Sequence, residues 1–185
     1  MYVKMIELRK IDKKNYQECL NLSVTESQAV FTKPNDVVLA EAWLYPYSAM
    51  PFAAYAHDFY VQDGDEIDED EEREYEDEGE MVGLIMPAFE SEKERYEIWH
   101  LMIDQRYQGK GYGKKALRQA ANYLIKQYNT EEIYSTIEPE NKEAENFYKE
   151  YGFSKLTKRV EKIDDNEIVL YLLLPKLRKK NKRIF

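Results

Sequence analysis

The stretch Gln108–Lys114 reads Q-G-K-G-Y-G-K and joins an apolar run, Ile98–Ile103, to a run with helical spacing. Glycines at 109, 111 and 113 allow sharp turns and leave backbone N–H groups uncovered. Because a helix follows, the positive end of its dipole lies at the same point, and the segment predicts a cradle for an anion. The spacing matches neither a Walker loop nor a complete G-x-G-x-x-G fingerprint, so the flanking sequence decides which anion is held.

Both flanks have the periodicity of regular structure. Upstream, Arg95–Ile103 is rich in aromatic and β-branched residues and predicts a buried strand. Strict alternation puts Glu97, Trp99, Leu101 and Ile103 on one face and Ile98, His100 and Met102 on the other, although a β-bulge would reverse this parity further along. Downstream, apolar residues recur at helical spacing over 112–128, so the glycine loop joins a strand to an amphipathic helix.

A second motif follows about thirty residues later. After a predicted strand, Ile133–Ile137, the stretch Pro139–Phe153 reads P-E-N-K-E-A-E-N-F-Y-K-E-Y-G-F. Asn141 is placed to cap a short helix that Gly152 ends, and Tyr148 lies two turns into it.

Together, Q-x-x-G-x-G after a strand and N-x-x-A-x-x-x-Y-x-x-x-G-F resemble the core of the GCN5-related N-acetyltransferase (GNAT) superfamily. The resemblance is strong over about 81–155. A weaker one covers 31–43, which is similar to the segment before the second strand of bacterial spermine/spermidine and diamine N-acetyltransferases.

The resemblance implies that acetyl-CoA lies in a V-shaped opening between the two central parallel strands, with its pyrophosphate on the glycine loop and its pantetheine arm along the first strand. The residues carried over to coenzyme binding are Leu101, Met102, Ile103, Gln108, Gly109, Lys110, Gly111, Tyr112, Gly113, Lys114, Asn141 and Tyr148. Asn141 as a helix cap alone, and Tyr148 as ordinary core, are the competing interpretations.

The reaction implied is acetyl transfer to an amine. An alkylamine with a pKa near about 10.4 is largely protonated at pH 7, a deficit of roughly 4–5 kcal/mol, so a base or a water chain is needed. Glu97 is the candidate base, with His100 second to it, and a solvated charge at the strand start is the alternative role for Glu97. Tyr148, close to the coenzyme sulfur in the family, is the candidate proton donor to the leaving thiolate.

The amine acceptor is expected to be a polyamine. The resemblance places its pocket between the early helices, the strand of Trp99 and the last hairpin, which makes Glu41, Trp43, Tyr45 and Glu97 candidate contacts. Carboxylates would pair with ammonium groups and aromatic faces with methylene spacers. Acetylation of a protein N-terminus or lysine, and a non-catalytic CoA-binding regulatory role, are the alternatives.

Length and composition favour a single α/β domain over residues 1–185. The 185 residues are 43% apolar, with no twenty-residue apolar run and one cysteine, Cys19, expected to be buried. We therefore expect a cytoplasmic protein with no membrane partner and no metal. The predicted strands are 3–9, 51–61, 80–88, 95–103, 132–138, near 153–161 and 167–174, and the predicted helices are 13–22, 35–44, 112–128 and 142–151, in a mixed, mostly antiparallel sheet. Pro87 is awkward in a central strand and suggests a bulge or an edge opening there.

The charge is unevenly distributed. Residues 62–80 hold thirteen acidic residues and one arginine, so this insertion in a hairpin loop carries −12 while the remaining chain carries +3. It is expected to be a solvated loop, or one that gathers polycations near the site, or one that pairs with the basic tail at 176–185. Six positive charges in that tail are weak support for nucleic acid, so no nucleic-acid partner is expected. The family resemblance allows a homodimer.

Overall fold

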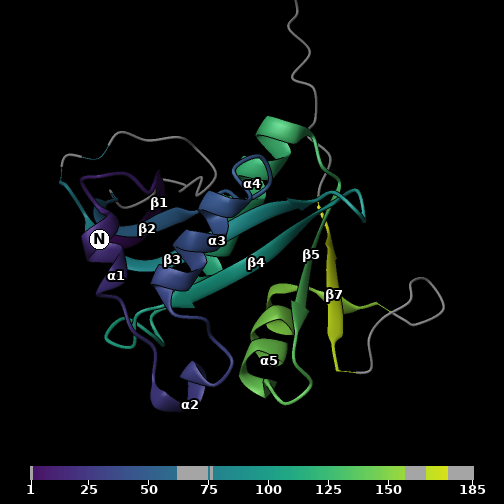
Figure 1. The fold of residues 1–185 in the computed structure, drawn as a ribbon. Helices are drawn as coiled ribbons and strands as arrows, with labels where there is room; N and C mark the ends of the chain where they lie inside the picture. Colours follow the sequence, from purple (N-terminus) through teal and green to yellow (C-terminus); the bar gives the residue numbers. More distant parts are fainter. Residues whose placement is uncertain (1, 62–74, 76, 157–165, 175–185) are drawn as a thin grey trace, which may run out of the picture.

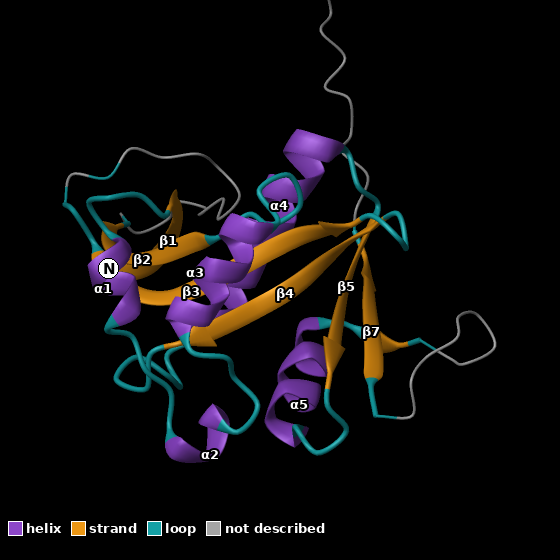
Figure 2. Cartoon of the chain, viewed as in Figure 1, coloured by secondary structure: helices purple, strands orange, loops and turns teal. Residues whose placement is uncertain are grey.

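The computed structural model describes residues 2–61, 75, 77–156 and 166–174, and in this part of the chain the strands form one seven-stranded sheet ordered β1-β2-β3-β4-β5-β7-β6 (Figures 1 and 2). Neighbouring strands are antiparallel except β4 and β5, which are parallel. The strands are β1 (Tyr2–Lys10), β2 (Phe52–Tyr60), β3 (Glu80–Glu90), β4 (Arg95–Ile103), β5 (Glu132–Ile137), β6 (Ser154–Lys155) and β7 (Ile168–Leu173). The helices are α1 (Tyr16–Leu20), α2 (Glu26–Ala29), α3 (Asn35–Leu44), α4 (Tyr112–Tyr128) and α5 (Lys142–Tyr151). The predicted mixed, mostly antiparallel α/β sheet is confirmed.

The longer helices, whose apolar residues recur at helical spacing, were predicted correctly. The helices predicted over 35–44, 112–128 and 142–151 are confirmed as α3, α4 and α5. The helix predicted over 13–22 is only the short α1, and α2 was missed because its four residues bury no side chain and carry no apolar pattern. The strand expected near 153–161 is described only as β6; its remainder, most of the insertion 62–80 and the tail 176–185 lie outside the described residues.

Helices cover both faces of the sheet, with α3 in front and α4 behind in Figure 1. On the α3 face, Cys19 of α1 and Val38 of α3 pack against sheet residues such as Met86. On the α4 face, Leu117 and Leu124 pack in a cluster that continues to α5 and β7. Cys19 is fully buried, as expected, and burial raises the pKa of its thiol to about 11, so it is an inert core residue.

The pairing of β3 with β4 changes register at one point. Met86 pairs with His100 and Pro87 with Ile98, which leaves Trp99 as an extra residue on β4. Pro87 has no N–H to donate to a ladder, so a proline is tolerated where the ladder is already interrupted. The bulge suggested by Pro87 is therefore confirmed.

This bulge decides which way the β4 side chains point. Ile98 and Leu101 both pack on the α4 face although they are three residues apart, which strict alternation does not allow. Trp99 packs on the α3 face. His100, next to Leu101, and Glu97, next to Ile98, accordingly lie on the α3 face too. The prediction that Glu97 and Leu101 share a face is wrong, because the bulge reverses the parity between them.

β4 and β5 pair with each other over only a short stretch. A single pair, Glu97 with Tyr134, forms the parallel register, and Ser135 Oγ donates a hydrogen bond to the Ile98 carbonyl oxygen at 3.3 Å. Beyond this apex the two strands diverge (Figure 1). The carboxyl end of β4 thus has β3 on one side and an opening on the other, which confirms the predicted V shape.

The last residues of the acidic segment are held against β1 and β2 by charged contacts. His57 of β2 is fully buried, with Asp77 against its Nδ1 and Glu7 Oε2 at 3.0 Å from its Nε2. Arg9 Nη1 donates to the Glu78 carbonyl oxygen at 2.7 Å. The segment therefore returns to the sheet through ionic contacts rather than through the apolar core.

Asp104 fixes the end of β4 to the segment that precedes α2. Its buried carboxylate accepts hydrogen bonds from Ser23 N–H at 2.9 Å, from Arg106 N–H at 3.0 Å and from Arg106 Nε at 2.7 Å. Burial raises the pKa of this carboxyl, but the hydrogen bonds from Arg106 and Ser23 outweigh it and leave the pKa below its ordinary value.

We predict that Asp104→Asn destabilises the fold by about 2 kcal/mol at pH 7, because an amide cannot replace the charge-assisted bonds. A pKa lowered on folding stabilises the fold above the ordinary value of about 3.9 and ceases to do so as pH falls through the folded pKa. The difference in melting temperature between the variant and the wild type should therefore be large at pH 7 and shrink near pH 3.

The matched control is Asp58→Asn, which removes the exposed ion pair with Lys4 at 2.7 Å and should cost less than about 1 kcal/mol. Equal losses in the two variants, or a difference for Asp104→Asn that does not change with pH, would contradict this account.

Candidate functional site

The glycine loop is shaped for close approach of a ligand to the backbone. Gly109 has φ +74° and Gly111 has φ +81°, in the left-handed region, and a Cβ at either position would meet nothing within 4 Å. Gly111 caps the start of α4, whose first N–H groups have no partner within the helix. Gln108 Nε2 donates to the Ile103 carbonyl oxygen at 2.8 Å and fixes the loop to the end of β4. The loop is therefore an open, electropositive turn of the kind that binds phosphate.

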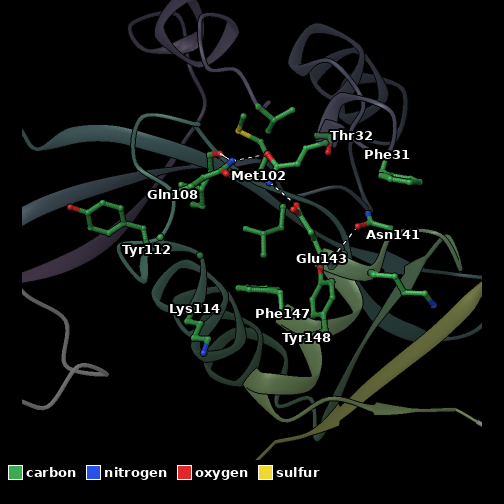
Figure 3. Close-up of a pocket in the computed structure, with 18 of the residues that line it drawn as sticks. Phe31, Thr32, Met102, Gln108, Tyr112, Lys114, Asn141, Glu143, Phe147 and Tyr148 are labelled. Carbon is green, nitrogen blue, oxygen red and sulfur yellow. Dashed lines mark hydrogen bonds between the residues drawn. The ribbon is translucent and has the colours of Figure 1, made fainter. Parts of the chain in front are cut away.

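A cavity of about 700 Å³ runs from this loop into the opening between β4 and β5 (Figure 3). It is bordered by the end of β4, the glycine loop, the start of α4, the first turns of α5 and the segment around α2. The lining residues are Val24, Ser27, Gln28, Phe31, Thr32, Leu101, Met102, Ile103, Tyr107, Gln108, Gly109, Gly111, Tyr112, Gly113, Lys114, Glu140, Asn141, Lys142, Glu143, Ala144, Phe147, Tyr148 and Glu150.

All residues predicted to bind the coenzyme line this cavity except Lys110. The Lys110 ammonium instead donates to the Arg106 carbonyl oxygen at 3.3 Å and lies 5.3 Å from the Tyr107 ring centre. The glycine loop and the motif with Asn141 and Tyr148, about thirty residues apart in the chain, therefore line the same cavity.

Tyr148 lies at the α5 border of the cavity, close to the apex of the strands. Its ring is almost fully buried, in edge contact with Phe147 at 5.3 Å and with Phe153 at 5.0 Å. Burial raises the pKa of the Tyr148 phenol to about 12, partly offset by a hydrogen bond with Ser135 of β5. The hydroxyl consequently stays protonated, and therefore a donor, throughout the neutral range. The Tyr148 ring therefore packs in the core, and the residue also lines the cavity, so a core position and a place at the site are compatible.

Asn141 also has two roles in the geometry. Its side-chain oxygen accepts a hydrogen bond from Ala144 N–H at 3.0 Å and caps α5, as predicted. It lines the cavity at the same time.

Three side chains from separate parts of the chain form a hydrogen-bonded bridge across the cavity. Gln28 of α2 and Gln108 exchange amide hydrogen bonds at 2.9 and 3.2 Å, and Gln28 Nε2 donates to Glu143 Oε2 of α5 at 2.9 Å. We call Gln28, Gln108 and Glu143 the amide bridge. Gln108 was expected to bind coenzyme, but its amide partner Gln28 is 80 residues away in the chain, so no local pattern indicated the bridge.

Glu97, the candidate base, does not line the cavity. Its buried carboxylate lies at the apex of the strands, with Arg95 Nε and Nη2 at 2.7 Å and Lys93 Nζ at 3.9 Å. The solvated role considered for it is wrong, because the side chain is buried and paired. Its catalytic role remains a prediction.

The candidate acceptor contacts lie on and after α3. Glu41 pairs with Lys33 at 2.6 Å, and the Tyr45 ring meets Trp99 edge-on at 5.8 Å. Trp43 is 79% exposed. None of these side chains lines the cavity, and all remain predictions.

Within the described residues no group of three or more His, Cys, Asp or Glu side chains is arranged to hold a metal ion. Among the same residues, no helix combines the length and apolar character that crossing a membrane requires.

A sheet opened between two parallel strands beside a glycine loop, with a tyrosine from the following helix in the cavity, is the class of fold that the sequence resemblance implied. The chain belongs to the acetyltransferase (GNAT) family, whose model matches residues 39–153, more than half of the chain.

The chain matches individual proteins at modest sequence identity and over only part of its length. Over 82 residues the chain is 35% identical to the spermine/spermidine N(1)-acetyltransferase of Bacillus subtilis, a segment covering 41% of this chain and 54% of that protein. It is 25% identical over 134 residues to an N-alpha-acetyltransferase of Sulfurisphaera tokodaii, covering 67% of this chain and 72% of the relative. The chain thus matches about half the length of the Bacillus relative.

Among solved structures, the fold is similar to that of spermidine N-acetyltransferase from Vibrio cholerae in complex with CoA and spermine. The TM-score is 0.63 with 17% sequence identity, over 93% of this chain and 97% of that one.

We predict that Glu143→Gln binds CoA about two- to fivefold more tightly than the wild type, because it removes a negative charge from a cavity suited to a polyphosphate while keeping an acceptor for Gln28. Calorimetric titration at low and at high salt measures the effect, which should shrink at high salt. Glu26→Gln changes the net charge equally on α2 outside the cavity lining and is the control. A similar gain in both variants would assign the effect to net charge, and an unchanged or weaker affinity in Glu143→Gln would contradict the prediction.

Proposed function

We propose that this protein transfers an acetyl group from acetyl-CoA to a primary amine, that of a polyamine, by direct attack in a ternary complex. The observation that carries the proposal is the position of Tyr148 in the same cavity that the glycine loop opens. A phosphate cradle at one part of the cavity and a protonated phenol near the strand apex suit a long coenzyme with a phosphate end and a reactive thioester end.

The chain's own groups suit the binding of that coenzyme. The N–H groups of the glycine loop would hold the pyrophosphate. Lys114 lines the same cavity, where its ammonium lies 3.0 Å from Glu150, so this pair adds no net charge to the lining. The free edge of β4 at Leu101–Ile103 would pair with the amide groups of the pantetheine arm, as an added strand does.

The reaction needs no covalent enzyme intermediate. The neutral amine nitrogen attacks the thioester carbonyl carbon, a C–N bond forms, and the C–S bond breaks as the tetrahedral intermediate collapses. The amine loses one proton overall and the thiolate gains one. Tyr148 is assigned to donate a hydrogen bond or proton to the leaving sulfur, and Glu97 or a water chain to accept the proton of the amine.

The polyamine assignment rests on the relatives and on charge. Proteins named as spermine/spermidine and spermidine N(1)-acetyltransferases are among the chain's relatives. The thirteen acidic residues of 62–80 would raise the local concentration of a polycation. The single domain, a homodimer and a cytoplasmic location stay predictions, as does the lack of a nucleic-acid partner.

Acetylation of a protein N-terminus is the second candidate. A protein named an N-alpha-acetyltransferase is also among the chain's relatives, and the match covers 67% of this chain. An acidic segment suits a basic peptide as well as a polyamine, so the two acceptors must be compared directly.

We predict that acetyl-CoA-dependent release of free thiol is fastest with spermine or spermidine in a panel with putrescine, an aminoglycoside and a basic peptide. Faster turnover of the peptide would move the proposal to the protein acceptor. Binding of acetyl-CoA without acetylation of any amine would support a non-catalytic role instead.

Tyr148→Phe should lower kcat by about 100-fold and change the dissociation constant of acetyl-CoA less than about twofold, since the lost hydroxyl acts only as the sulfur leaves. Because the pKa of Tyr148 is about 12, its ionisation should cause no loss of wild-type rate between pH 7 and 9. The control is Tyr123→Phe on α4, another tyrosine whose burial raises its pKa to about 12 but which lies outside the cavity lining. An unchanged kcat in Tyr148→Phe would remove this residue from the mechanism.

A further inference from the structure

His100 is a buried polar side chain with one ring nitrogen that finds no hydrogen-bond partner among the described residues. It is 8% exposed, and its Nε2 has no partner within the described part of the chain. Buried polar atoms are nearly always paired, and leaving one unpaired destabilises the fold, so an orphan atom in a core strand calls for a functional explanation.

The bulge of β4 places this side chain on the α3 face, beside Trp99. Met102, two residues further along, packs on the same face and lines the cavity. His100 itself does not line the cavity; it lies on β4 between Ile98, at the apex of the strands, and Leu101, where β4 begins to border the cavity.

The segment after α2 connects His100 with the cavity from the other side. Phe31 and Thr32 line the cavity, and Lys33, the next residue, is close enough to act on His100 electrostatically. Burial, and then the Lys33 charge, lower the pKa of His100 to about 4, while Glu41 acts in the opposite direction. The imidazole is thus neutral at pH 7, with one nitrogen able to accept a hydrogen bond.

The other polar candidate on this face is already occupied. The Glu97 carboxylate is paired with the Arg95 guanidinium at 2.7 Å. Releasing it toward an amine would break a buried ion pair with the Arg95 guanidinium, which is costly. The His100 imidazole requires no such exchange.

We propose that His100 is the acceptor-binding residue of β4: its Nε2 accepts a hydrogen bond from the attacking amine nitrogen and directs the lone pair of that nitrogen toward the thioester. The inference rests on the proposed acetyltransferase function and adds the contact that orients its acceptor. On the same face the Trp99 and Tyr45 rings are in edge contact at 5.8 Å. The Glu41 carboxylate is close enough to act on His100 electrostatically. These groups suit an ammonium on a methylene chain.

The test compares His100→Leu, which removes the nitrogen at similar volume, with His100→Gln, which keeps a polar group at a similar reach. Spermidine and spermine binding to the CoA-saturated protein is measured by calorimetry, together with kcat/KM for each amine. We expect His100→Leu to weaken amine binding and to lower kcat/KM by about 10- to 100-fold. CoA affinity should change less than about twofold, and His100→Gln should recover most of the loss.

Thermal unfolding separates this role from a structural one. Because His100→Leu removes an unpaired buried polar atom, the melting temperature should stay equal or rise while amine binding falls. A lower melting temperature with unchanged amine affinity, or a loss that His100→Gln does not recover, would overturn the proposal.

The two proposals fail in different ways. Turnover of a polyamine that His100→Leu leaves unchanged would overturn the role of His100 alone. Amine binding that depends on His100 without any acetyl transfer would support the site and overturn the acetyltransferase function. Absence of both amine binding and turnover in the wild type would overturn both.

Discussion

The single hydrogen-bonded register pair between β4 and β5 is the constraint on which the rest of the site depends. Parallel strands normally continue their ladder, but here pairing stops after Glu97 and Tyr134. The end of β4 is left with a free edge, and an unpaired strand edge tends to gain another strand or an extended ligand. The glycine loop follows directly on this edge, so the phosphate cradle and the free edge form one continuous surface.

The bulge at Trp99 is the second organising feature. It allows Leu101 to pack beneath the cavity on the α4 face, while Trp99 and His100 lie together on the α3 face. Within a few residues, β4 therefore presents functional candidates to both faces of the sheet. Two reactants that approach from opposite faces can meet there, which a regular strand with alternating side chains would allow less readily.

Helix α5 combines capping, charge and chemistry in ten residues. Asn141 caps its start and Tyr148 lies seven residues later, about two turns, so the two lie near the same side of the helix. Glu145, buried behind them, is paired with Lys149 at 2.5 Å, Lys155 at 2.7 Å and Lys142 at 3.0 Å. Lys155 belongs to β6, so this cluster ties α5 to that strand and helps to fix the helix that carries Tyr148.

The sequence by itself determined the parts whose signals are local. The glycine loop between a strand and a long amphipathic helix, the capped helix with Tyr148, and the sheet class all follow from periodicity, turn chemistry and caps within short windows. Pro87 indicated the bulge for the same reason, since its missing N–H is a property of one residue.

Only the tertiary structure decided the rest, because it depends on contacts between distant residues. A solvated Glu97 at the strand start was one expectation, but the fold buries this side chain against Arg95. Gln28 and Glu143 are 115 positions apart, and their bond across the cavity follows from how α2 and α5 are placed. The orphan nitrogen of His100 likewise appears only once the bulge has set its face and the surrounding elements have buried it. Short-range patterns fix which element forms, whereas burial and pairing are set by the packing of the whole sheet.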